Sequence, residues 1–91
     1  MQFLVHMQLE MPADMPAEQA NDIKAREKAY SQQLQREGKW PHIWRVVGES
    51  ANYSVFDVAD NDELHALLSG LPLFPYLKIK VTALARHPVA I

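Results

Sequence analysis

The chain has 91 residues, of which 48% are hydrophobic and 22% charged, and its formal net charge is −2. These values are typical of a globular fold, so we expect one small domain over residues 1–91 that binds neither nucleic acid nor an anionic membrane. Because cysteine is absent, there is no disulfide framework, no zinc–thiolate site and no thiol nucleophile.

The N-terminal segment predicts a strand rather than a targeting sequence. In residues 2–10, Phe3, Val5, Met7 and Leu9 alternate with polar side chains, which is typical of a half-buried strand. The segment has no basic leader, and no apolar run approaches the roughly 20 residues of a transmembrane helix. We therefore expect a cytoplasmic protein.

The next segment predicts a helix from about residue 16 to residue 37, ended by Gly38. Its apolar stripe runs through Ala20, Ile23, Tyr30 and Leu34, and Glu27 interrupts it. A carboxylate packed between helix and sheet loses hydration, and its pKa rises from about 4.3 toward the neutral range, where it is an effective base. Alternatively, Glu27 lies at the edge of the stripe and its carboxylate reaches water.

The remaining segments predict a hairpin of residues 40–47 and 51–58, a short helix over 60–70 capped by Asp60, and a last strand over 77–84. The order β-α-β-β-α-β is that of the α+β, ferredoxin-like sandwich, with a four-stranded antiparallel sheet and two helices on one face. The other face needs a cover, so we expect a homo-oligomer. The apolar segments "LPLFPYL" (71–77) and "ARHPVAI" (85–91) are our candidates for subunit contacts.

Arg45 is a second anomaly, because it alternates with Ile43 and Val47 and so shares a strand face with apolar residues. A guanidinium there suits bidentate binding of a carboxylate. Alternatively, it pairs with Asp57 or Glu27. The same alternation assigns the opposite face to Trp40, His42, Trp44 and Val46.

Other polar residues give weaker signals. The four histidines show no metal-ligand spacing, so we expect no metal, and three scattered glycines make no phosphate loop. His42, between two tryptophans, can donate a hydrogen bond into a pocket. Tyr30 and Tyr53 are either core rings or donors to a substrate oxygen.

Several motifs together resemble the muconolactone Δ-isomerases of the β-ketoadipate pathway. They are "KAREKAYSQQLQREGKW", "ANYSVFDV", "LPLFPY" and "RHP", and the resemblance extends over nearly the whole chain. It implies a ferredoxin-like fold of the dimeric α+β barrel type, a homo-oligomer built from dimers (a decamer), and no cofactor. It also implies a small lactone carboxylate as the substrate and a 1,3-proton shift that gives 3-oxoadipate enol-lactone.

On this resemblance, Glu27 fits the catalytic base and Arg45 fits the anchor for the substrate carboxylate. The lactone oxygen needs a donor, for which the candidates are His42, Tyr30 and Tyr53. Apolar walls that exclude water from the pocket can come from Trp40, Trp44 and Phe74.

Three alternatives remain open from the sequence. The first keeps the fold and dehalogenates chloromuconolactones, the second is a cofactor-free ferredoxin-like monooxygenase, and the third is a non-catalytic binding or assembly module in which Glu27 is only structural.

Overall fold

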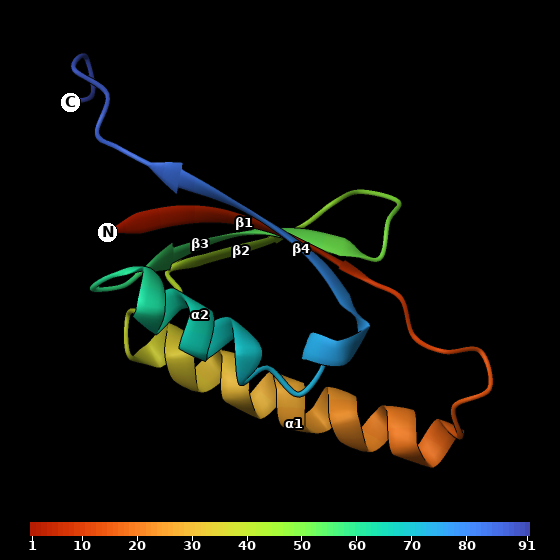
Figure 1. The fold of residues 1–91 in the computed structure, drawn as a ribbon. Helices are drawn as coiled ribbons and strands as arrows, with labels where there is room; N and C mark the ends of the chain where they lie inside the picture. Colours follow the sequence, from red (N-terminus) through yellow and green to blue (C-terminus); the bar gives the residue numbers. More distant parts are fainter.

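The predicted order of elements is present in the computed structural model, which describes residues 1–91. The elements are β1 (Gln2–Leu9), α1 (Ala17–Arg36), β2 (His42–Arg45), β3 (Ala51–Asp57), α2 (Asn61–Ser69), the short 3-10 helix η1 (Phe74–Tyr76) and β4 (Leu77–Leu84). The strands form one antiparallel sheet in the order β2-β3-β1-β4. Both helices lie on one face of it (Figure 1). The prediction of a ferredoxin-like α+β fold is confirmed.

The helix boundaries follow the capping signals in the sequence. Gly38, with φ of 77°, lies just beyond the end of α1 in the left-handed conformation that favours glycine. At the start of α2, the Asp60 carboxylate accepts a hydrogen bond from the backbone N–H of Glu63 at 2.8 Å. The Glu63 carboxylate in turn accepts one from the backbone N–H of Ala59 at 3.0 Å. The two helices therefore begin and end close to the predicted residues.

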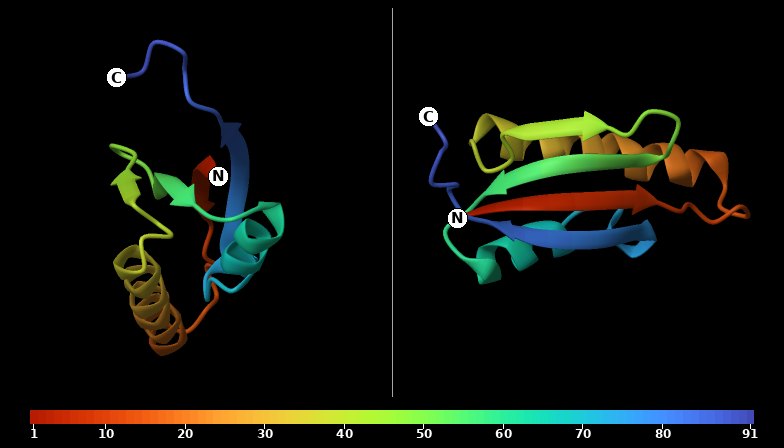
Figure 2. Two further views of the ribbon diagram at one scale, coloured as in Figure 1. Left: turned by 90° about the vertical axis from the view of Figure 1, so that its left-hand side faces the viewer. Right: turned by 90° about the horizontal axis from the view of Figure 1, so that it is seen from above.

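The core lies between the helices and the inner face of the sheet. Along β1, Phe3, Val5 and Met7 are buried, as their alternation predicts. Seen from above, α1 runs beneath the β2–β3 half of the sheet and α2 beneath the β1–β4 half (Figure 2). The rings of Trp40 and Phe56 stack with centroids 4.6 Å apart where α1, β2 and β3 meet.

The prediction of the strand face on which Trp40 lies is wrong. We placed it with His42 and Trp44, but β2 begins only at His42, so the alternation of a strand does not extend back across Pro41 to Trp40. Trp40 is instead buried on the helix side of the sheet. At the other end β2 stops at Arg45, and Val47 is fully exposed in the turn that contains Gly48.

The outer face of the sheet has no cover within the chain (Figure 2). It exposes large aromatic side chains, among them Trp44 at 55% and Tyr53 at 44%. These rings contact neighbours on the same face: His42 stacks on Trp44 at 4.9 Å, and His6 lies 4.7 Å from Tyr53. We call His6, His42, Trp44 and Tyr53 the aromatic patch.

The two segments that we expected at subunit contacts differ in structure. Leu71 and Leu73 are buried within their own chain, so for these side chains the expectation of an exposed segment is wrong; Phe74 is partly exposed. The tail after β4 extends away from the body (Figure 1), and Val89 is 78% exposed.

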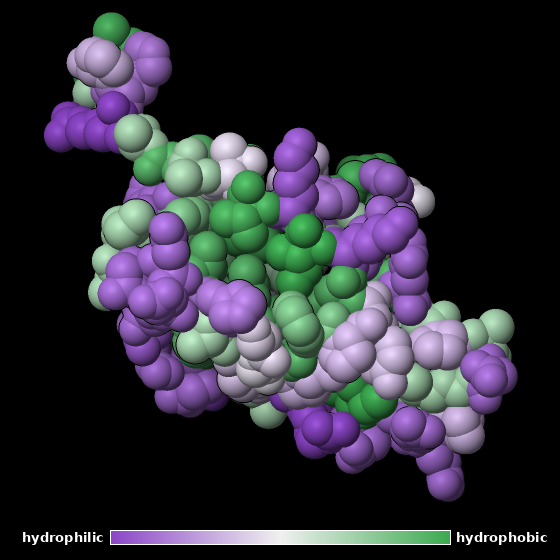
Figure 3. Space-filling model, in the orientation of Figure 1, coloured by the Kyte–Doolittle hydropathy of each residue, from purple (hydrophilic) through white to green (hydrophobic).

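Hydrophobic side chains also gather over β4 and between β4 and α2 (Figure 3), where Val81 is exposed. Neither helix is long and apolar enough to cross a membrane.

Candidate active site

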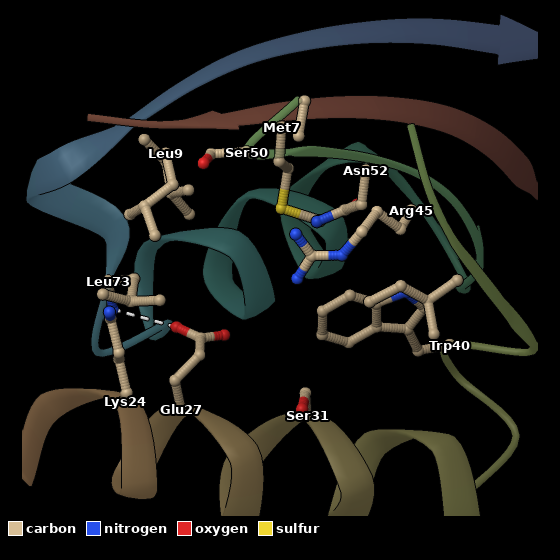
Figure 4. Close-up of a pocket in the computed structure, with 13 residues that line it drawn as sticks. Met7, Leu9, Lys24, Glu27, Ser31, Trp40, Arg45, Ser50, Asn52 and Leu73 are labelled. Carbon is tan, nitrogen blue, oxygen red and sulfur yellow. Dashed lines mark hydrogen bonds between the residues drawn. The ribbon is translucent and has the colours of Figure 1, made fainter. Parts of the chain in front are cut away.

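A cavity of about 480 Å³ lies between α1 and the inner face of the sheet, where β1 and β2 end and β3 and β4 begin. Its volume falls within the roughly 300–1,000 Å³ of small-molecule sites. Seven of its thirteen lining residues are hydrophobic. The lining comprises Met7, Leu9, Lys24, Glu27, Ser31, Trp40, Ile43, Arg45, Ser50, Ala51, Asn52, Leu73 and Leu77 (Figure 4). The site is therefore a mostly apolar space with a few charged and polar groups.

Glu27 is half-buried and points from α1 into this cavity (Figure 4). One carboxylate oxygen, Oε1, accepts a hydrogen bond from the backbone N–H of Leu73 at 2.9 Å. Burial raises the pKa of Glu27, and the hydrogen bond from Leu73 opposes the rise without cancelling it. Glu27 thus has one fixed oxygen and a proton affinity higher than that of a glutamate in water.

Arg45 extends from the end of β2 into the same cavity, on the wall opposite α1 (Figure 4). Lys24 is the second cation in the lining and lies on α1 one turn before Glu27. Neither of them forms an ion pair within the chain, because the salt bridges involve other residues and Asp57 pairs with the N-terminal amine. The cavity therefore offers unpaired positive charge to an anionic ligand.

Trp40 forms a wall of the cavity with its ring. Its indole N–H is buried and has no hydrogen-bond partner. Together with Glu27 and Arg45, Trp40 is one of three sequence-predicted site residues that the fold brings together.

Tyr30 does not line the cavity, although it lies one turn after Glu27 on α1. Its hydroxyl donates a hydrogen bond to the backbone carbonyl of Leu67 at 2.7 Å and so joins α1 to α2. A Cβ at Gly70 would lie 2.6 Å from this hydroxyl, so the tyrosine requires glycine there. The position of Tyr30 is that of a structural side chain.

His42, Trp44 and Tyr53 also lie outside the cavity, because they belong to the aromatic patch on the outer face of the sheet. Strand alternation separates them from Ile43 and Arg45, which face the helices. Phe74, in η1, follows the cavity residue Leu73 but does not line the cavity itself. Within one chain, these four residues do not join Glu27 and Arg45.

Four polar residues of the lining are not among the predicted site residues: Lys24, Ser31, Ser50 and Asn52. A signal existed for Asn52, since it shares its strand face with Ser54 and Phe56, and Phe56 is buried. Two polar residues on the inner face of a strand indicate either a hydrogen-bond network or a site. No three His, Cys, Asp or Glu side chains lie close enough together to hold a metal ion.

The fold and the site define a small ferredoxin-like protein whose cavity combines a semi-buried carboxylate with unpaired cations. The sequence model of the family described as muconolactone delta-isomerase matches residues 1–90. The chain belongs to this family, which confirms the resemblance predicted from the sequence.

Similar proteins cover essentially the full chain. The muconolactone Δ-isomerase of Cupriavidus pinatubonensis is 69% identical over 91 residues, covering 100% of this chain and 99% of its own. Muconolactone Δ-isomerase 1 of Acinetobacter lwoffii is 66% identical, with coverage of 100% and 95%.

Solved structures agree with the fold. A crystal structure of muconolactone isomerase has 52% identity and a TM-score of 0.95 and covers 100% of this chain and 95% of its own. A 5-chloro-2-hydroxyhydroquinone dehydrochlorinase from Burkholderia phenoliruptrix, at 16% identity, has a TM-score of 0.70 over 96% of each chain and shares the fold alone.

The raised pKa of Glu27 predicts a pH-dependent cost in stability. The folded chain holds this proton more tightly than the unfolded chain, whose glutamate titrates near 4.5. The protonated Glu27 therefore stabilises the folded chain fully below that pH. This contribution is lost as the pH rises through the higher pKa of the folded state. We expect Glu27→Gln, which does not titrate, to gain free energy of unfolding relative to the wild type as the pH rises from about 4 toward 7.

Urea unfolding at several pH values and one protein concentration measures this difference. Glu18→Gln, at an exposed position in the first turn of α1, controls for the loss of one carboxylate. A difference between Glu27→Gln and the wild type that is flat or shrinks with pH would contradict the prediction.

Proposed function

We propose that this chain, as one domain over residues 1–91, is a cytoplasmic, cofactor-independent muconolactone Δ-isomerase of catechol degradation. The observation that supports the reaction best is the carboxylate of Glu27 in a cavity whose opposite wall carries Arg45. This arrangement provides a base and an anion anchor for a small lactone carboxylate.

The reaction moves one proton and changes no oxidation state. A base removes the proton from the γ-carbon of the unsaturated lactone ring. The electron pair left behind spreads through the ring to the carbonyl oxygen of the lactone, which gives an oxygen-substituted furan, an aromatic anion. The base then returns the proton to the α-carbon, and the double bond has moved to the β,γ position.

Glu27 suits both proton transfers. Its Oε1 is held by Leu73, whereas Oε2 accepts no hydrogen bond within the chain and is free for the substrate. Because burial raises the pKa of this carboxyl group, it accepts a carbon-bound proton more readily at neutral pH than an exposed glutamate does. The product forms when the same group gives the proton back.

Arg45 suits the carboxymethyl group of the substrate. This carboxylate keeps the same charge throughout the proton shift, so its binding energy contributes almost equally to the ground state and to the transition state. Trp40 and the aliphatic residues of the lining exclude water around the ring. His42, Tyr30, Tyr53, Trp44 and Phe74 have no place in this proposal, because they do not line the cavity.

The first test is Glu27→Gln, which keeps the size of the side chain and an acceptor for the Leu73 N–H but removes the base. We expect kcat for muconolactone to fall at least about 100-fold, with folding unchanged, as is typical of a positioned general base. Absorbance assays of lactone isomerisation measure this, with Glu18→Gln as the matched control. Turnover within a few-fold of the wild type would contradict the assignment of Glu27 as the base.

Faster chloride release from a chloromuconolactone than isomerisation of muconolactone would favour the dehalogenase alternative.

The second test is Arg45→Ala. We expect KM to rise about tenfold or more while kcat falls less, because the interaction that is lost is mostly uniform binding. Steady-state kinetics separate the two constants, and Arg36→Ala, at the exposed end of α1, controls for the loss of a guanidinium. An unchanged KM in a folded variant would transfer the role of anchor to Lys24.

We further propose that the chain works as a homo-oligomer built from dimers, with a decamer as the expected assembly. The support is the outer face of the sheet, where Trp44 and Tyr53 are exposed and no element of the chain covers them. Aromatic side chains of this kind are enriched in the buried centres of subunit interfaces.

Trp44→Lys tests this assembly. A charged side chain in a buried aromatic interface loses its hydration, so we expect a species of lower mass by light scattering at micromolar concentration. Val47→Lys, at a fully exposed apolar position in the β2–β3 turn, is the matched control. A wild type that is monomeric and fully active, or a Trp44→Lys variant of unchanged mass, would contradict the proposal.

A further inference from the structure

We infer that the side-chain amide of Asn52 donates a hydrogen bond to the carbonyl oxygen of the substrate lactone, and that the hydroxyl of Ser54 holds the amide in that orientation. The inference rests on the proposed function and assigns the oxyanion donor that none of the sequence-predicted candidates supplies from within the cavity.

Ser54 is the only buried polar residue of the chain, with an exposed fraction of 0%. Its neighbours in the sheet are Val5 on β1 and Ile43 on β2, so an aliphatic side chain would suit this position. A buried hydroxyl destabilises a core unless it is hydrogen-bonded. The partner here is a side chain: the Ser54 hydroxyl donates to Oδ1 of Asn52 at 2.7 Å.

This bond decides which end of the Asn52 amide is free. With Oδ1 occupied by the Ser54 hydroxyl, the NH₂ group remains available, and Asn52 forms no other side-chain hydrogen bond within the chain. Asn52 lines the cavity, and its nitrogen points away from the sheet toward the space beside Met7 and Arg45 (Figure 4). The amide therefore presents a donor rather than an acceptor to a ligand.

The strand pairing fixes the backbone of Asn52. It lies on β3 between two other strands, directly opposite Met7 on β1 and Arg45 on β2. Glu27 approaches from α1 on the other wall (Figure 4). A lactone ring between the walls therefore has the base on one side and the Asn52 and Arg45 donors on the other.

Two donors on one wall match the two oxygen-bearing groups of the substrate. The guanidinium of Arg45 suits the permanent charge of the carboxylate. The neutral amide of Asn52 suits the carbonyl oxygen of the lactone, where negative charge appears only as the γ-proton leaves. A preoriented donor aimed at developing charge stabilises the transition state more than the ground state.

Four variants test the inference: Asn52→Ala, Asn52→Asp, Ser54→Ala and Asn61→Ala, the last an exposed amide at the start of α2 as control. We expect Asn52→Ala to lower kcat about 100- to 1,000-fold with a smaller change in KM, as for the loss of an oxyanion donor. Asn52→Asp keeps the acceptor for Ser54 but replaces the donor with an acceptor, so its loss should be at least as large. Ser54→Ala should lower kcat by a smaller factor, because the amide remains but is free to turn.

A binding experiment separates this role from a structural one. meta-Hydroxyphenylacetate resembles the aromatic anion, whereas phenylacetate lacks the oxygen that Asn52 would contact. Wild type and Asn61→Ala should bind the hydroxylated compound more tightly in competition assays, and Asn52→Ala should lose this preference while still binding phenylacetate. Thermal unfolding and light scattering verify that each variant is folded and assembled.

The outcomes distinguish the inference from the proposed function. If the wild type does not isomerise muconolactone, the proposed function fails. If it does, but Asn52→Ala keeps kcat within a few-fold or Asn52→Asp remains active, the assignment of Asn52 as donor is overturned. A preference for the hydroxylated compound that survives in Asn52→Ala would overturn it as well.

Discussion

The hydrogen bond between the backbone N–H of Leu73 and the Glu27 carboxylate is the contact on which the site depends. It joins the middle of α1 to the segment between α2 and β4, two parts of the chain that are far apart in sequence. Leu71 and Leu73, buried on either side of Pro72, hold that segment against the core. The irregular backbone after α2 thus leaves one N–H free to orient a carboxylate, which a regular helix or strand would not.

The same hydrogen bond offsets only part of the effect of burial on the Glu27 carboxylate. A nearby cation would lower the pKa of Glu27 and weaken it as a base, but neither Arg45 nor Lys24 pairs with it. A single neutral donor opposes the effect of burial without reversing it. The position accordingly costs stability at neutral pH, where an aliphatic side chain would complete the stripe of α1. Such a cost is typical of functional positions in small domains, which have little stability to spare.

Much of the fold follows from local signals, whereas the site follows from them only in part. The stripe of α1, the Asp60 cap, Gly38 and the alternation in β1 each depend on neighbours within a few residues, so the sequence predicts them directly. Glu27 and Arg45 stood out because each interrupts an apolar pattern. The partner of Glu27 is a backbone group that no side-chain pattern reveals. The face of Trp40 was predicted wrongly because the strand begins only after Pro41. Asn52 was missed although it alternates with Ser54 and Phe56, because the alternation alone does not show which face of β3 turns toward the helices.

Strand alternation finally divides the chemistry of the sheet between two faces. On β2 and β3, Ile43, Arg45 and Asn52 face the helices and line the cavity, and Ser54 is buried on the same face, whereas His42, Trp44 and Tyr53 face outward. A one-residue shift in the pairing of β2 would exchange the faces of its own side chains, so that Trp44 would replace Arg45 on the cavity side and Arg45 would face outward. The pairing of His42 with Val55 and of Arg45 with Asn52 therefore fixes the cavity face and the outer face at the same time. The short β2 strand can hold that register because Pro41 and the Gly48 turn bound it closely on both sides.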